Sequence, residues 1–136
     1  MYEHRLFIIH RTELYSRKEG AENLVIGNMI AEYNCSRMPH SFLDLFADAK
    51  EIDFTLFVNQ GDAWVETKED CYGEHCKMVK LPDVIAYLEN LTNSEEWGTY
   101  RRLAPLLGLL KGFDESQWDE SRLDGNDSLW VVNYGY

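Results

Sequence analysis

The longest helical pattern of hydrophobic positions lies in the segment Trp97–Phe113, WGTYRRLAPLLGLLKGF. Its leucines recur at spacings of three and four residues, which places them on one face of a helix: Leu103, Leu106, Leu107 and Leu110. Further apolar residues widen that face, so the pattern predicts a helix buried on most sides, with Leu107 fully buried at its centre. Pro105 is tolerated only in the first turn of a straight helix, which predicts a break near Ala104.

Two other segments have the features of amphipathic helices. One is expected to begin at Leu81, because Pro82 suits a first helical turn, and its inward residues should be Val84, Ile85, Leu88 and Leu91. The other is Ser41–Ala49, which follows the chain break at Pro39, with Ser41 as its predicted N-cap. Its expected inward residues are Phe42, Leu45, Phe46 and Ala49.

Strand patterns fill much of the remaining chain. Leu6–Ile9 is apolar at every position, which is typical of a central strand covered on both faces. Val25–Cys35 alternates with a period of two and favours a strand, with a helix over Ala21–Tyr33 as the alternative. Further strands are predicted at Phe54–Val58, Ala63–Thr67, Cys76–Leu81 and Leu129–Tyr134. We expect the second and third of these to pair as a hairpin across the polar segment Lys68–His75.

The order of these elements predicts the fold class. Strands, a short helix, further strands, two helical segments and a last strand indicate an α+β fold with a mostly antiparallel sheet covered by helices on one face. The 136 residues fit a single compact domain, 1–136, and the sequence contains no internal repeat or linker that would divide it.

The net charge of −11 is the compositional feature that bears on function. It argues against binding nucleic acid through a basic surface, because phosphate contacts need clustered Lys and Arg. The charge is also uneven: segment 44–74 has nine acids against two lysines, and segment 114–127 has six acids against one arginine, whereas segment 1–18 is slightly basic. A basic protein partner is therefore expected, although acidic surfaces also serve only to keep small proteins soluble.

Each acidic segment contains a tryptophan, Trp64 in the first and Trp118 in the second. An exposed aromatic side chain among acids would anchor a basic partner, and the alternative is that both side chains are buried in the core. We predict that the partner-binding residues are Trp118, Asp114, Glu115, Asp119, Glu120 and Asp124.

The strongest candidate for a chemical site is the segment DCYGEHC, Asp70–Cys76. Its Cys71, His75 and Cys76, with Cys35 as a further thiolate, are possible ligands of a soft metal. The C-x4-C spacing is wider than that of a zinc knuckle, however, and no second Cys or His pair follows it. The alternative is a turn at Tyr72-Gly73 that brings the two cysteines to or near cross-strand positions.

A second pair of titratable residues, His4 and His10, is predicted to project from one face of the first strand. With an acid nearby they would form an acid–base site, and without one they are half-exposed side chains at the ends of a strand. The sequence contains no nucleophile elbow, phosphate-binding glycine loop or paired His motif. An enzyme is therefore without positive support, and no cofactor is expected.

The first ten residues lack the apolar run and cleavage site of a secretory signal peptide. The apolar segment Trp97–Phe113 is too short to span a membrane. We therefore expect a cytoplasmic protein with no membrane contact.

The C-terminal third, YRRLAPLLGLLKGFDESQWDESR followed by LWVVNYGY, resembles small accessory proteins encoded by bacteriophages and prophages. The resemblance implies a non-enzymatic, acidic interaction protein that inhibits a bacterial defence or nucleic-acid-processing protein by binding its basic surface. A metal protein or small enzyme that uses Cys71, His75 and Cys76 is the alternative.

Overall fold

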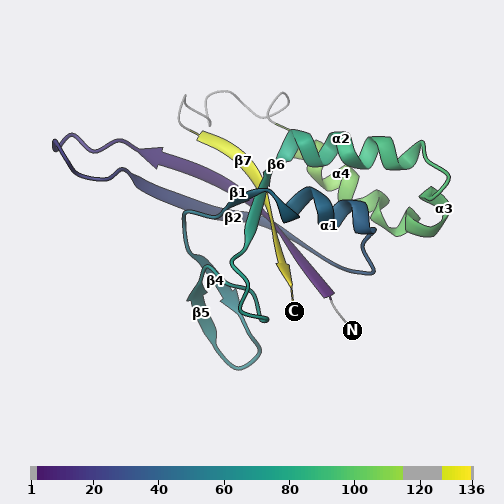
Figure 1. Ribbon diagram of the computed structural model, residues 1–136, viewed down its shortest axis with the longest axis horizontal. Coiled ribbons are helices and arrows are strands. Elements are labelled where there is room, and N and C mark those ends of the chain that lie inside the picture. The colour runs from purple at the N-terminus through teal and green to yellow at the C-terminus, as the bar shows by residue number, and fades with distance from the viewer. Residues whose placement is uncertain (1–2, 115–126, 136) are drawn as a thin grey trace.

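The computed structural model describes residues 3–114 and 127–135, and within them the main feature is a five-stranded sheet whose pairs are all antiparallel (Figure 1). Its strand order is β2-β1-β7-β6-β3. The strands are β1 (Glu3–Leu14), β2 (Leu24–Ser36), β3 (Lys50–Glu51), β6 (Lys77–Lys80) and β7 (Asp127–Gly135). The predicted α+β fold, with a mostly antiparallel sheet, is confirmed.

Strand β1 lies inside the sheet, between β2 and β7, and has apolar side chains on both faces. All four residues of Leu6–Ile9 are buried, as the continuous apolar pattern predicts. Alternation sends Leu6 and Ile8 to one face of the sheet and Phe7 and Ile9 to the other, where they join separate apolar clusters. The predicted strand Val25–Cys35 is also confirmed as β2, and the helical alternative is wrong.

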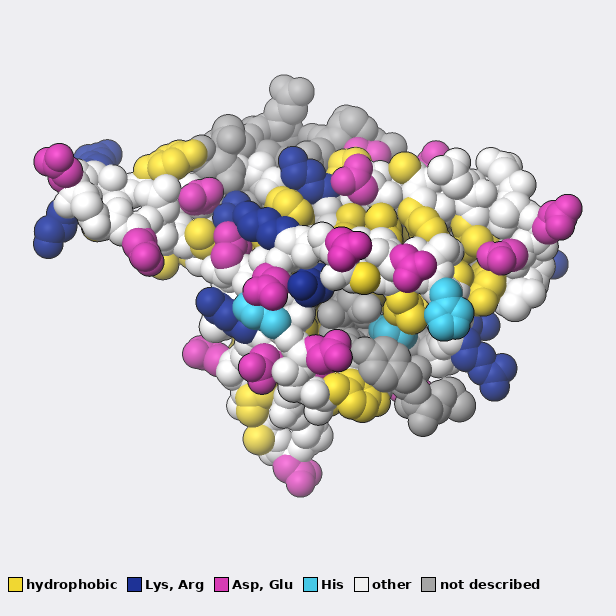
Figure 2. Space-filling model, viewed as in Figure 1, with side chains coloured by type: hydrophobic (Ala, Val, Ile, Leu, Met, Phe, Trp, Pro, Cys, Tyr) yellow, Lys and Arg dark blue, Asp and Glu magenta, His cyan; other side chains and the backbone are white. Residues whose placement is uncertain are grey.

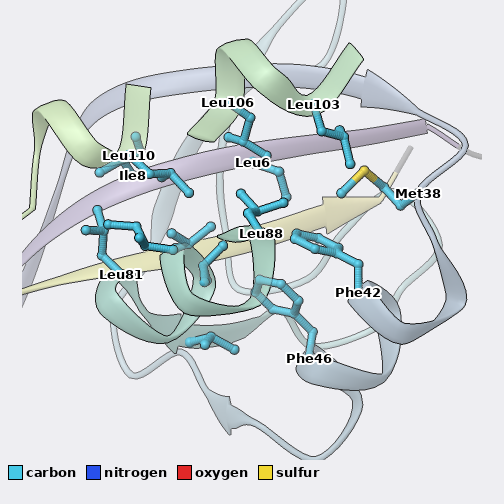
Figure 3. Packing of buried hydrophobic residues seen from close by; sticks show 14 of the residues in the cluster. Leu6, Ile8, Met38, Phe42, Phe46, Leu81, Leu88, Leu103, Leu106 and Leu110 are labelled. Atoms are coloured by element: carbon cyan, nitrogen blue, oxygen red, sulfur yellow. The ribbon is translucent and has the colours of Figure 1, made fainter. Parts of the chain in front are cut away.

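Helices cover one face of the sheet (Figures 1 and 3). They are α1 (His40–Ala47), α2 (Leu81–Thr92), α3 (Trp97–Tyr100) and α4 (Ala104–Gly112), with a 3-10 turn at Arg101–Leu103. We call their apolar contact with the sheet the helical-face core; it includes Leu6 and Ile8 of β1 together with Phe42, Phe46, Leu81, Leu88, Leu103, Leu106 and Leu110. The predicted inward face of α2 is confirmed, because Val84, Ile85, Leu88 and Leu91 are all buried.

The segment Trp97–Phe113 breaks where Pro105 predicts, since α4 begins at Ala104. The prediction that this segment is buried on most sides is wrong, however, and so is the full burial of Leu107. Leu103, Leu106 and Leu110 are completely buried, whereas Leu107 is half-buried and Gly108 is exposed. The reason is that α4 lies on the surface of the fold, so only the stripe of side chains facing α2 and the sheet loses contact with water.

The predicted N-cap at Ser41 is also wrong. Helix α1 begins at His40, its N-cap is Pro39, and no side chain caps it. Ser41 therefore lies inside the first turn, and its hydroxyl hydrogen-bonds the Tyr87 hydroxyl of α2 instead. This bond links the two helices.

A two-stranded sheet, β4 (Leu56–Asn59) and β5 (Trp64–Thr67), belongs to the other side of the molecule (Figure 1). With the segment before it, β4 forms the hairpin-face core, which contains Phe7, Ile9, Ile52, Phe54, Leu56, Val58, Cys76, Met78, Val132 and Tyr134. The expected hairpin between Ala63–Thr67 and Cys76–Leu81 is wrong, because β5 pairs with β4 whereas β6 pairs with β3 and β7. Gly61, at φ +89°, permits the tight turn that favours the local pair.

Two contacts tie the segment before β4 to the main sheet. The Phe54 ring lies over Gly27 of β2, where a Cβ atom would come within 2.3 Å of the ring. The Arg11 guanidinium donates two hydrogen bonds to the Asp53 carboxylate, at 3.0 and 2.6 Å. This arginine holds the pKa of Asp53 below its usual value, as expected for a partly buried bidentate pair.

Leu106 and Leu107 provide a direct test of how α4 is oriented. Leu106→Ala should lower the free energy of unfolding by about 2–5 kcal/mol, because it removes a fully buried side chain and leaves a cavity. Leu107→Ala should lower it clearly less, since that side chain is only half-buried. Urea unfolding of both variants measures the difference, and equal losses would contradict this orientation.

Gly27 and Gly108 make a second matched pair. Gly27→Ala should destabilise the fold by about 1–3 kcal/mol, because the new methyl group overlaps the Phe54 ring. Gly108→Ala, in the exposed part of α4 with nothing within 4 Å, should instead stabilise it by about 0.5–1 kcal/mol. Thermal unfolding of both variants should therefore shift in opposite directions.

Candidate functional site

The outer face of the β4–β5 hairpin is the candidate functional site. The register pairs Phe57 with Glu66 and Asn59 with Trp64, and all four side chains are exposed. Their neighbours Leu56 and Val58 point the opposite way, into the hairpin-face core. We refer to Phe57, Asn59, Trp64 and Glu66 as the hairpin surface.

Two aromatic side chains dominate this surface. The rings of Phe57 and Trp64 are stacked, with centroids 5.2 Å apart and planes 21° from parallel. Phe57 is nevertheless 54% exposed and Trp64 60% exposed. Because a stack hides only the facing sides of two rings, the outer side of the indole is open to solvent. The interpretation that Trp64 is buried is therefore wrong, and its exposure is as expected of an anchor for a partner.

The charge around the aromatic pair is negative. The segment Leu56–Thr67 contains Asp62 and Glu66 and no Lys, Arg or His. Among residues 3–114 and 127–135, no ion pair involves either of these carboxylates. Figure 2 shows many acidic side chains, interspersed with lysines and arginines, on the face of the molecule turned to the viewer. A cation that approaches the hairpin surface therefore meets two carboxylates that are not engaged in an ion pair with the described bases.

The other predicted partner-binding residues form no described surface. The residues that lie outside the described part of the chain are Trp118, Glu115, Asp119, Glu120 and Asp124. Asp114 lies two residues beyond the end of α4 and is half-buried. Its backbone N–H donates to the carbonyl of Lys111 at 3.3 Å. The second acidic segment therefore stays a prediction.

The candidate metal ligands are not brought together. Cys76 belongs to the hairpin-face core, whereas Cys35 packs against the helical-face core on the opposite side of the sheet. The His75 ring has its own partners, the carbonyl of Ile52 at 3.0 Å and the carboxylate of Glu51 at 3.3 Å. In the described part of the chain, no group of three or more His, Cys, Asp or Glu side chains is placed to hold a metal ion.

Two of the thiols are also buried in a way that disfavours the thiolate. Burial raises the pKa of Cys35 to about 11 and that of Cys76 to about 12. Both are protonated near neutral pH, whereas a metal ligand or nucleophile is a thiolate. Cys71 and Cys76 are not cross-strand neighbours either, because the turn pairs Glu69 with His75 and so sets Cys76 opposite Lys68.

A polar cleft of about 540 Å³ lies beside the hairpin surface, next to the end of β7. Within it the Tyr134 hydroxyl accepts a hydrogen bond from Gln60 Nε2 at 2.7 Å and lies 3.2 Å from Cys71 Sγ. Burial, with a further contribution from Cys71, raises the pKa of Tyr134 to about 12. The hydroxyl thus stays protonated and connects the β4–β5 turn and the segment around Cys71 to β7.

His4 and His10 each contact a different residue of β7, and for His10 that residue is an acid. His4 is only 2% exposed, and its Nδ1 hydrogen-bonds Asn133 Oδ1 at 2.8 Å, so its expected half-exposure is wrong. His10 is half-buried and contacts Asp127 Oδ2 at 2.9 Å. Since each ring bonds a different residue of β7, they act as separate links between β1 and β7.

No family model, curated protein or solved structure matches this chain. The resemblance to phage accessory proteins is therefore a prediction that rests on the sequence alone. Within the described residues, none of the helices combines the length and apolar character needed to cross a membrane.

The burial of His4 predicts how stability depends on pH. Desolvation lowers its pKa below the usual value of 6.5, although the Asn133 bond and the Asp70 charge oppose this shift. The unfolded state therefore takes up the proton first as the pH falls. The contribution of His4 is full above about pH 6.5 and is lost as the pH falls through the lower, folded-state pKa.

His4→Gln removes this titration while it keeps a hydrogen-bonding side chain. Urea unfolding between pH 7 and pH 5 should show a smaller loss of stability for His4→Gln than for the wild type. His40→Gln, at an exposed position in the first turn of α1, is the matched control and should behave like the wild type. If the free energy of unfolding depended on pH in the same way in His4→Gln and in the wild type, the lowered pKa of His4 would be contradicted.

Proposed function

We propose that this protein is a non-enzymatic interaction module that binds the basic surface of another protein, and that the hairpin surface is a principal contact. The observation that carries the proposal is the exposed, stacked pair of Phe57 and Trp64 beside two carboxylates, Asp62 and Glu66, that form no ion pair with the bases the structure describes. Tryptophan is among the residues most often found at the energetic centre of protein interfaces.

Overall charge supports the same conclusion. A chain with a net charge of −11 attracts basic surfaces from beyond contact distance and repels nucleic acid and acidic proteins. The second acidic segment, with Trp118 and its neighbouring acids, remains part of the proposed partner surface.

The biological setting follows from the phage-like C-terminal third. We propose that the protein is phage-encoded, acts in the cytoplasm of a bacterium, and inhibits a defence or nucleic-acid-processing protein. Such proteins bind nucleic acid through basic surfaces, which makes them suitable targets for an acidic inhibitor.

The test is capture of partners from bacterial lysate with the immobilised full chain. A specific partner should bind at low salt and be lost near 1 M salt, where the Debye length shrinks to about 3 Å. Trp64→Ala should reduce its capture about tenfold or more, as expected for a central interface tryptophan.

Tyr15→Ala is the matched control, because Tyr15 is a similarly exposed aromatic residue, at 65%, next to the end of β1. It should leave capture unchanged. Equal effects of the two variants, or no salt-sensitive partner, would overturn the proposed function. A captured protein with no role in defence or nucleic-acid processing would overturn the inhibitor assignment alone.

A further inference from the structure

The four side chains of the hairpin surface form two diagonals. The aromatic side chains Phe57 and Trp64 occupy one diagonal and are stacked on each other. Asn59 and Glu66 occupy the other, with Asn59 opposite Trp64 and Glu66 two residues from it on the same strand. A two-residue step along a strand is about 7 Å, so the Glu66 carboxylate is within side-chain reach of a group placed over the indole.

This arrangement complements a planar cation. The open side of the Trp64 ring presents the negative face of a π system, and Glu66 presents two acceptor oxygens beside it. A guanidinium group is planar, so it stacks on the ring and donates a pair of parallel hydrogen bonds to a carboxylate. An ammonium group is not planar and makes neither of these contacts.

The same chemistry is already present inside this fold. The Arg5 guanidinium carbon lies 5.3 Å from the Phe7 ring centroid and 5.8 Å from that of Tyr134. Its Nε also donates to the Glu32 carboxylate. Two aromatic rings and the Glu32 carboxylate thus surround the Arg5 guanidinium, which also donates from Nη1 to the backbone carbonyl of Asn59 at 2.9 Å. On the hairpin surface the Glu66 carboxylate forms no ion pair within residues 3–114 and 127–135.

We infer that the hairpin surface takes an arginine side chain of the basic partner, stacked on the open side of Trp64 and hydrogen-bonded to Glu66. This inference rests on the proposed function and adds the identity of the group that is recognised. Lysine in the same position is the weaker ligand, because its ammonium group attracts the ring face and the carboxylate but cannot stack as a plane or donate two parallel hydrogen bonds.

The probes are N-acetyl-argininamide and N-acetyl-lysinamide, which carry the same charge. The full chain has four tryptophans, so its indole N–H groups give four resolvable NMR signals, and Trp64→Phe identifies that of Trp64. Titration with the arginine probe should shift the Trp64 signal most. Its Kd should be about threefold lower than that of the lysine probe, the scale of one exposed cation–π contact.

Two variants that each remove one negative charge separate the effect of Glu66 from the effect of the protein's overall negative charge. Glu66→Gln should weaken binding of the arginine probe and reduce its advantage over the lysine probe, whereas Glu19→Gln, in the exposed β1–β2 loop, should change neither. Equal affinity for both probes, a larger shift at another indole, or equal effects of the two variants would overturn the inference. Capture of a lysate partner that depends on Trp64 would in that case leave the proposed function intact, so the two failures are distinguishable.

Discussion

The burial of β1 on both of its faces is the constraint on which the rest of the structure depends. The central residues of β1, Leu6–Ile9, are all apolar and would meet water on whichever face of the sheet was left open, so both faces must be covered. Helices α1, α2 and α4 cover one face and form the helical-face core, and the segment from Ile52 through β4 covers the other and forms the hairpin-face core. In the described part of the chain the two clusters lie on opposite faces of the sheet, which gives three layers with β1 and β7 at the centre.

The candidate site results from the way the β4–β5 hairpin covers the second face of the sheet. A two-stranded sheet is only one layer thick, so the side chains that alternate away from the core have nothing above them. Leu56 and Val58 are turned inward by the hairpin-face core, and this fixes Phe57 on the outside. Pairing with β5 then places Trp64 within stacking distance of Phe57, with Glu66 directly opposite Phe57. The exposed aromatic pair is thus held by the same contacts that stabilise the fold.

The arginines of β1 and the acids of the hairpin surface differ in whether they form ion pairs within the described structure. Two arginines of β1 are paired with acids: Arg11 bonds Asp53, and Arg5 bonds Glu32 beside two aromatic rings. On the hairpin surface Glu66 lies opposite Phe57 and two residues from Trp64, and it forms no ion pair among the described residues. A surface that lacks the counter-charge used elsewhere in the molecule is suited to a partner that supplies it.

Local pattern by itself determined β1, β2, α2 and the break before α4, because each depends on the spacing of apolar residues or on Pro105 within one segment. The sequence also marked Trp64 as an aromatic side chain among acids, but it did not identify Phe57, although alternation along FTLFV was the available signal. Tertiary structure decided that β5 pairs with β4, that Leu107 is half-buried, and that Cys35 and Cys76 lie on opposite faces of the sheet. These outcomes depend on which elements pack together, and burial is a property of that packing rather than of any single segment.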